Sequence, residues 1–327
     1  MAEIAFRQAL REALQEEMRR DERVFLMGEE VALYNGAYKV SQGMLDEFGP
    51  KRIIDTPIAE LGFTAIAVGA AANGLRPVVE FMTWNFAVLA LDQILNHSAK
   101  MLSMSGGHFG NPIVFRGPNA SAGQLGAQHS QAFESWFANI PGIKVISVSN
   151  PYDAKGLLKS AIRDDDPVVF MESEVMYGDL GEVPTEEYLI PIGKARIARE
   201  GTDVTIISYN KMMKVALGAA EELAKEGISA EVIDLRTIRP LDHETILNSV
   251  KKTNRCVIVE EQWPFASISS EIAYRVQKDA FDYLDAPVLR ICSADTNMHY
   301  APNLVASYLP DVGRTVNLVK EAMYLKK

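Results

Sequence analysis

Short apolar segments alternate with segments of helical periodicity along the first half of the chain. The apolar segments predict buried strands at 24–27, 53–55, 78–81, 112–116, 144–149 and 168–172. The segments between them predict helices near 61–73, 87–104, 127–138 and 152–163. Continuously apolar strands that are separated by helices are typical of a mostly parallel sheet with helices on both faces. We therefore predict an α/β domain over 1–184.

The second half repeats this alternation after a connecting segment at 185–201, where the pattern weakens. Its apolar segments predict strands at 203–208, 230–235, 256–260 and 288–292, and its periodic segments predict helices at 212–226, 242–252, 267–280 and 313–325. A chain of 327 residues is also longer than one typical core. We predict a second α/β domain over 202–327, with a mostly parallel sheet flanked by helices.

Composition narrows the classes of partner. The formal net charge of −10 argues against nucleic acid, whose phosphates it would repel, and it would suit a basic protein partner. An acidic surface that only improves solubility gives the same charge. No apolar run is long enough for a membrane, the start does not resemble a signal or transit peptide, and Cys256 and Cys292 lack metal-ligand spacing. We expect a cytoplasmic protein of bacterial type.

One carboxylate stands out because of its setting. Glu60 lies at the start of the predicted helix 61–73, after a buried strand and the break at Pro57. The helix dipole favours a carboxylate there, whereas the apolar neighbours Leu61 and Phe63 favour the protonated acid. Such a balance suits acid/base chemistry, and an ordinary helix-capping glutamate would give the same pattern.

Two further segments carry candidate residues. The aromatic-rich strand end at 81–86 could line a ligand crevice through Met82 and Trp84, or it could be core. His129 follows a glycine-containing loop at 117–123 and opens the predicted helix 127–138. A helix start disfavours a protonated imidazole, so His129 could carry protons near neutral pH. A structural histidine is the alternative.

Several motifs, spread over essentially the whole chain, resemble one known family. That family is the beta subunits of pyruvate dehydrogenase, the thiamine-diphosphate-dependent decarboxylating component of the 2-oxo acid dehydrogenase complexes, which are transketolase-like proteins. The segments that carry the resemblance are Asp-Thr-Pro-Ile-Ala-Glu at 55–60 and the segments at 36–41, 115–119, 127–131, 153–164 and 236–240.

The resemblance implies roles for individual residues. The glutamate that matches Glu60 hydrogen-bonds a ring nitrogen of the cofactor's aminopyrimidine and thereby activates the thiazolium carbon. The aromatic that matches Phe86 stacks on the aminopyrimidine, and we keep Met82 as a wall of this pocket. The histidine that matches His129 assists acyl transfer to the lipoyl group.

The resemblance also implies a potassium ion. In relatives, backbone carbonyl oxygens at the positions of Ile113, Ala161, Ile162, Asp164 and Asp166 surround the ion. From the residues alone, the acids at 164–166 would equally form a solvated turn at the end of a helix.

Half of a thiamine diphosphate site is missing from this sequence. Enzymes of this kind usually bind the diphosphate through magnesium with a Gly-Asp-Gly motif, and the nearest match here is Gly178-Asp179-Leu180. The resemblance therefore implies that an alpha subunit supplies the diphosphate and magnesium sites in an alpha-two beta-two tetramer. It also implies contacts with a dihydrolipoyl acyltransferase through its peripheral-subunit-binding and lipoyl domains.

We expect a subunit that, with its alpha partner, decarboxylates pyruvate and reductively acetylates lipoyl groups. Two alternatives share the fold and the cofactor: the beta subunits of branched-chain 2-oxo acid dehydrogenase and of acetoin dehydrogenase. An alternative of another class is a noncatalytic assembly subunit, against which the presence of Glu60, Phe86 and His129 counts.

Overall fold

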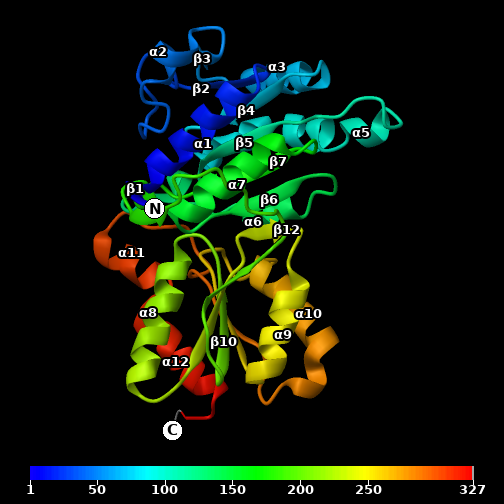
Figure 1. Cartoon of the computed structure of the whole chain (residues 1–327). Helices are drawn as coiled ribbons and strands as arrows, with labels where there is room; N and C mark the ends of the chain where they lie inside the picture. The colour runs from blue at the N-terminus through cyan, green and yellow to red at the C-terminus, as the bar shows by residue number, and fades with distance from the viewer. Residues whose placement is uncertain (326–327) are drawn as a thin grey trace. The chain divides into compact units, whose positions relative to one another are not determined.

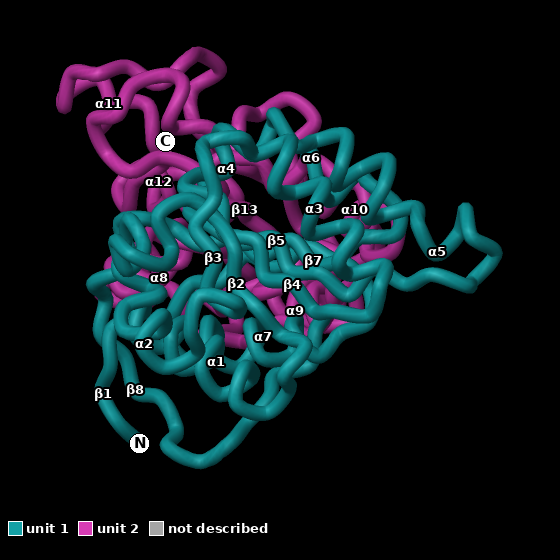
Figure 2. Tube along the Cα trace, turned by 90° about the horizontal axis from the view of Figure 1, so that it is seen from above, with its two compact units in different colours: residues 1–119, 136–192 teal, residues 120–135, 193–327 magenta. Residues whose placement is uncertain are grey.

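The computed structural model of the chain describes residues 1–325 (Figure 1). Its contacts divide the chain into two compact units (Figure 2). The first unit comprises residues 1–119 and 136–192, and the second comprises residues 120–135 and the chain from 193 onward. The short segment 120–135 thus interrupts the first unit in sequence but belongs to the second unit in space.

The first unit is built on a parallel sheet with strand order β6-β7-β5-β4-β2-β3. The strands are β2 (Val24–Gly28), β3 (Ile53–Asp55), β4 (Arg76–Glu80), β5 (Val114–Pro118), β6 (Lys144–Ser147) and β7 (Val168–Glu172). Every residue of β2, β4, β5 and β7 is buried, as expected for strands with helices on both faces. The predicted parallel α/β sheet is confirmed.

Helices and one small antiparallel ribbon complete this part of the chain. The ribbon pairs β1 (Ala2–Ala5) with β8 (Leu180–Val183). Apolar residues at four-residue spacing on α1, such as Phe6, Leu10 and Leu14, pack into the core together with residues of α7. The helical segments are α1 (Phe6–Arg20), α2 (Met44–Phe48), α3 (Glu60–Ala72), α4 (Trp84–Ala87), η1 (Val88–Ala90), η2 (Gln93–Ser98), α5 (Met101–Met104), α6 (Glu134–Ala138), α7 (Pro151–Arg163) and η4 (Glu174–Met176).

Two predicted helices are interrupted. The segment 87–104 contains the end of α4, a 3₁₀ turn, the π-helical η2 and the short α5, and η2 carries Asn96, His97 and Ser98, which are poor helix formers. The segment 127–138 contains the single 3₁₀ turn η3 (Ala127–His129) and then α6. The carbonyl of Gln131 accepts the amide of Ala120 at 3.0 Å, so it is used to close a loop.

The second unit has a sheet of its own, with strand order β14-β13-β10-β11-β9. Its neighbours pair in parallel except β9, which runs antiparallel to β11. Helices α8 and α12 cover one face of this sheet, and α9 and α10 cover the other (Figure 1). The elements are β9 (Arg196–Arg199), β10 (Val204–Ser208), α8 (Met212–Lys225), β11 (Ala230–Asp234), β12 (Thr237–Arg239), α9 (His243–Thr253), β13 (Cys256–Val259), α10 (Ile268–Ala280), η5 (Phe281–Tyr283), β14 (Leu289–Ile291), α11 (Pro302–Tyr308) and α12 (Val312–Ala322).

The predicted connection at 185–201 contains the strand β9. Its sequence Arg-Ile-Ala-Arg is only partly buried and lies at the edge of the sheet, so it lacks the continuous apolar signal of a central strand. The domain ranges 1–184 and 202–327 remain a proposal. No helix within the described residues is both long enough and apolar enough to cross a bilayer.

Candidate functional site

Two glutamates meet at the carboxyl edge of the first sheet. Glu29 directly follows β2, and Glu60 opens α3 after β3 and the turn at Pro57. Because β2 and β3 are parallel neighbours, their carboxyl ends bring the two residues to the same edge. Glu29 and Glu60 are 5% and 4% exposed, and their carboxyl groups interact with each other.

Burial raises the pKa of Glu29 to about 7, and the charge of Glu60 and the hydrogen bond to it act in the same direction. The backbone amide of Met82 donates to Glu29 and opposes part of this rise. Neither Glu29 nor Glu60 forms an ion pair within the described part of the chain. Because its pKa is about 7, Glu29 can both hold and release a proton near neutral pH.

Glu29 was not predicted from the sequence. The available signal was the pair Gly28-Glu29 at the carboxyl end of a buried strand, next to the strand that leads to Glu60. Position 28 requires a glycine, because a Cβ there would overlap the carbonyl oxygen of Glu80 on β4. A glycine at this point allows β2 to lie close to β4.

Aromatic residues after β4 separate into core and surface. Trp84 is fully buried, with its ring centroid 4.8 Å from that of Phe137 and 5.4 Å from that of Phe81. The expectation that Trp84 lines a pocket is therefore wrong, because its indole fills the core. Phe86 on α4 is 37% exposed, and Met82 is half-buried beside the glutamate pair. Phe86 and Met82 are thus the accessible members of this segment.

A buried charge network lies across the middle strands of the same sheet. Arg116 on β5 pairs with Glu80 on β4 and with Glu172 on β7, and the Arg116 Nε to Glu172 Oε1 distance is 2.6 Å. The hydroxyl of Tyr177 donates to Glu172 at 2.8 Å. Burial raises the pKa of Glu80, and the negative charge of ionised Glu80 is a smaller cause of the raised pKa of Glu29. The network thus links the core of the sheet electrostatically to the glutamate pair.

His129 lies in the second unit, within the segment 120–135. It ends the 3₁₀ turn η3, and its side chain is exposed. The helix start that the sequence predicts at this position is absent, so the argument from a helix dipole does not apply.

The predicted potassium ligands lie around the carboxyl end of α7. Ile113 precedes β5, Ala161 and Ile162 belong to the last turn of α7, and Asp164 and Asp166 follow it. The carbonyl of Ile113 accepts the amide of Val168 at 2.9 Å, and that of Ala161 accepts the amide of Asp164 at 3.3 Å.

The ammonium group of Lys144 pairs with two of the acidic side chains of this turn. Lys144 Nζ lies 2.7 Å from Asp164 Oδ2 and 3.1 Å from Asp166 Oδ2. A monovalent ion here would therefore depend on backbone carbonyls at a helix end, which carry partial negative charge.

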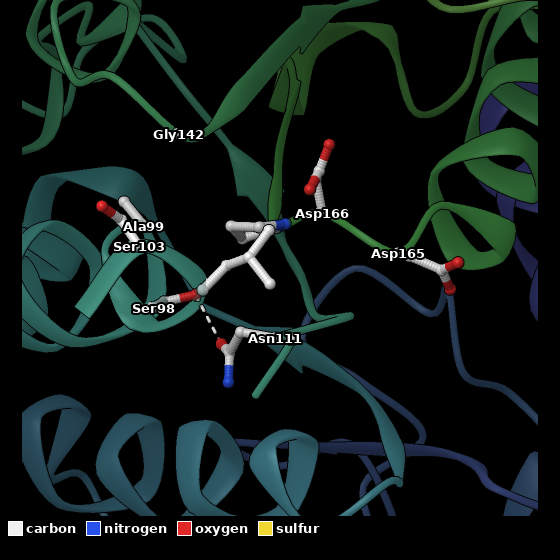
Figure 3. Close-up of a pocket in the computed structure, with 10 residues that line it drawn as sticks. Ser98, Ala99, Ser103, Asn111, Gly142, Asp165 and Asp166 are labelled. Atoms are coloured by element: carbon white, nitrogen blue, oxygen red, sulfur yellow. Dashed lines mark hydrogen bonds between the residues drawn. The ribbon is translucent and has the colours of Figure 1, made fainter. Parts of the chain in front are cut away.

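A pocket of about 200 Å³ lies next to this turn (Figure 3). Asp166 is the predicted potassium ligand that lines it, and Ser98 on its wall donates to Asn111 at 2.6 Å. Asp165 also lines the pocket, and its carboxylate pairs with Arg76 at 2.6 Å. The side chains of Ser98, Asn111, Asp165 and Asp166 thus have protein partners. Among the described residues, no cluster of three or more His, Cys, Asp or Glu side chains could hold a metal ion.

Comparison with known families defines the class of protein. Residues 2–179 match the transketolase pyrimidine-binding domain, and residues 193–314 match the transketolase C-terminal domain. A solved structure described as a split-gene transketolase, an inactive beta4 tetramer, shares the fold with a TM-score of 0.79 at 22% identity and covers 99% of each chain. The fold and both domains are therefore transketolase-like.

Closer relatives narrow the class. The chain is 55% identical to the pyruvate dehydrogenase E1 component subunit beta of Rhizobium meliloti over 99% of this chain and 71% of that protein. It is 54% identical to the same subunit of Rickettsia conorii, over 98% and 99%, and 54% identical to the mitochondrial subunit of Dictyostelium discoideum, over 99% and 92%. The chain belongs to the family of pyruvate dehydrogenase E1 component beta subunits, which is dependent on thiamine diphosphate.

Proposed function

We propose that this chain, together with an alpha subunit, decarboxylates pyruvate and reductively acetylates the lipoyl groups of an acyltransferase core, so that the full complex yields acetyl-CoA. The observation that supports this most strongly is the buried pair Glu29 and Glu60 at the carboxyl edge of a pyrimidine-binding domain. Family membership at more than 50% identity over the full chain supports the choice of pyruvate over branched-chain 2-oxo acids and acetoin.

The donor set fits the aminopyrimidine of thiamine diphosphate. A ring nitrogen needs a partner that can both give and accept a proton, and a buried carboxyl pair in which the pKa of Glu29 is raised to about 7 is such a partner. When bound, the cofactor supplies a carbon nucleophile that attacks the 2-oxo group and takes up the electron pair left by the loss of carbon dioxide. Glu60 would hydrogen-bond the ring nitrogen, and Glu29, whose pKa is raised to about 7, would carry a proton beside it.

The other candidate residues orient the cofactor or transfer a proton. Phe86 presents an exposed ring for stacking against the pyrimidine, and Met82 forms the adjacent wall while its amide fixes Glu29. His129 moves a proton during acyl transfer to the lipoyl group. Its exposure on a loop suits a substrate carried by another protein.

The partner must bring the rest of the site. We propose an alpha subunit that supplies the diphosphate and magnesium sites, in an alpha-two beta-two tetramer, because this sequence has no complete Gly-Asp-Gly motif. The acyltransferase would contact the second domain through its peripheral-subunit-binding domain. The net charge of −10 agrees with a basic docking module. A cytoplasmic location is consistent with two free cysteines.

The variant Glu60→Gln, co-expressed with the alpha partner, tests the role of the pair. Glutamine keeps the size and the hydrogen-bonding shape but cannot release a proton, so we expect dye-linked decarboxylation of pyruvate to fall roughly 10²–10⁴-fold. The tetramer should still assemble in size-exclusion chromatography. The matched control is Glu271→Gln, because Glu271 also lies in the first turn of a helix but is exposed. Near-normal turnover by the Glu60 variant would refute the assignment.

A further inference from the structure

The segment that carries His129 is anchored by a buried ion pair of the second unit. Lys211 lies just before α8, beyond the carboxyl end of β10, and Glu261 lies beyond the carboxyl end of the neighbouring β13. Lys211 Nζ is 2.7 Å from Glu261 Oε2. The two side chains are only 8% and 7% exposed, so this pair is removed from water.

Ser121 completes the arrangement with all three of its polar groups. Its amide donates to Glu261 Oε1 at 2.9 Å, while its hydroxyl oxygen lies 2.7 Å from Lys211 Nζ and its carbonyl oxygen also accepts from Lys211. A lysine ammonium has three donors, and here they serve Glu261 and the two oxygens of Ser121. We call Lys211, Glu261 and Ser121 the clasp.

Further bonds hold the rest of the segment. Gln262, next to Glu261, donates from Nε2 to Glu134 Oε2 at 3.0 Å near the segment's far end. Gln124 Nε2 donates to the carbonyl of Tyr300 at 3.4 Å. The segment is therefore tied to the second unit near both ends, with His129 between these points.

The hydrogen bonds from the ion pair to Ser121 indicate that the pair positions the segment that carries His129. A lysine and a glutamate beyond neighbouring strands could simply neutralise each other, but two of the three lysine donors and one carboxylate oxygen are directed at Ser121. The carboxyl edge of a parallel sheet, where such folds usually bind ligands, thus binds a segment of the same chain. We propose that Lys211 and Glu261 are positioning residues that hold the His129 segment for acyl transfer, an inference that rests on the proposed role of His129.

The test compares two reactions of the co-expressed tetramer. Dye-linked decarboxylation does not use the lipoyl group, whereas reductive acetylation of a free lipoyl domain does. In Lys211→Met, we expect kcat for reductive acetylation to fall roughly 10- to 100-fold, because a displaced catalytic group loses its geometry. Dye-linked decarboxylation should stay within about twofold, since its proposed residues lie in the first unit. The control is Lys225→Met, an exposed lysine at the end of α8, the helix that Lys211 precedes.

Amide hydrogen exchange tests whether the clasp is formed, independently of catalysis. The amide of Ser121 should be protected in the wild type and in Lys225→Met, and it should exchange faster in Lys211→Met, while the amides of β5 stay unchanged. If Lys211→Met does not assemble, the double variant Lys211→Met with Glu261→Met replaces it, because apolar substitution of both partners leaves no unpaired buried charge.

His129→Asn separates the two ideas in the same assays. If it retains full reductive acetylation, the proposed role of His129 fails and the positioning inference fails with it, although faster exchange at Ser121 would still verify the contacts. If His129→Asn loses acyl transfer but the clasp variant keeps it, only the positioning inference is overturned. An equal loss of both reactions in the clasp variant would also overturn it, because that pattern indicates a general structural role.

Discussion

At the scale of the residue, the central feature is the raised pKa of Glu29 beside a second buried acid, Glu60. Burial is the main cause of this rise, and the charge of Glu60 adds to it, because two adjacent carboxyls in a buried site cannot both ionise at low cost. The pKa of Glu29 thus depends on a neighbour that is 31 positions later in the sequence.

The raised pKa of Glu29 predicts a specific pH dependence of stability. Below about pH 4.5 the folded and unfolded chains both carry the proton, and between about pH 4.5 and 7 only the folded chain keeps it. Relative to Glu29→Gln, the wild type should therefore lose roughly 1–3 kcal/mol of stability as pH rises through this window, and no more above it. Thermal midpoints of both proteins at several pH values measure this difference.

The control for this experiment is Glu30→Gln, the exposed glutamate next in sequence. Its midpoint relative to the wild type should show no such trend. A midpoint difference between the wild type and Glu29→Gln that stays constant from pH 4.5 to 7 would contradict the raised pKa of Glu29.

At the scale of the element, the close approach of β2 and β4 places Glu29. The variant Gly28→Ala would insert a methyl group against the carbonyl of Glu80, so the strands must separate. We expect a loss of about 1–3 kcal/mol, seen as a lower thermal midpoint, together with reduced decarboxylation because Glu29 moves. Gly110→Ala is the control, because its nearest neighbour is 3.9 Å from the added carbon. Unchanged stability and activity of Gly28→Ala would refute the packing argument.

The turn after α7 predicts an effect of potassium. Carbonyl oxygens of Ile113, Ala161 and Ile162, with those of Asp164 and Asp166, would bind the ion in the folded state only. The thermal midpoint should then be higher in potassium chloride than in sodium chloride of equal concentration, by about 1 kcal/mol or roughly 2–4 °C. Equal midpoints in the two salts would count against an ion at this position.

Most elements could be predicted from local pattern, and the exceptions have tertiary causes. Strand 168–172 lies where the apolar run predicts it, because a buried parallel strand requires apolar residues on both faces. The edge strand β9 carries no such signal. The break in 127–138 depends on a bond between Ala120 and Gln131, which no periodicity reveals.

The residues of the candidate site likewise divide into those that a sequence motif predicts and those that depend on tertiary structure. Glu60, Phe86 and His129 could be proposed from motifs that resemble a known family. Glu29 could not, because its significance arises only where the ends of β2 and β3 meet. Trp84 was misplaced because an aromatic at a strand end has the same local pattern whether it faces a pocket or the core. Lysine and glutamate are common on protein surfaces, so the burial of Lys211 and Glu261 becomes evident only in the folded chain.

At the scale of the whole molecule, the proposed function assigns half of a catalytic centre to this chain. The pyrimidine-binding domain carries Glu29 and Glu60, and the second unit holds the segment with His129. The sequence lacks the complete motif that would bind the diphosphate through magnesium. We therefore expect the chain to be inactive by itself and to gain activity only with an alpha subunit.

The most direct test of this account is a comparison of substrates with the assembled tetramer. The chain would be co-expressed with an alpha partner that carries Gly-Asp-Gly, and thiamine-diphosphate-dependent turnover of pyruvate, 2-oxoisovalerate and acetoin would be measured with a dye acceptor. We predict a strong preference for pyruvate and no turnover by either subunit alone. Preference for another substrate, or an inactive but well-formed tetramer loaded with cofactor and magnesium, would contradict the proposed function.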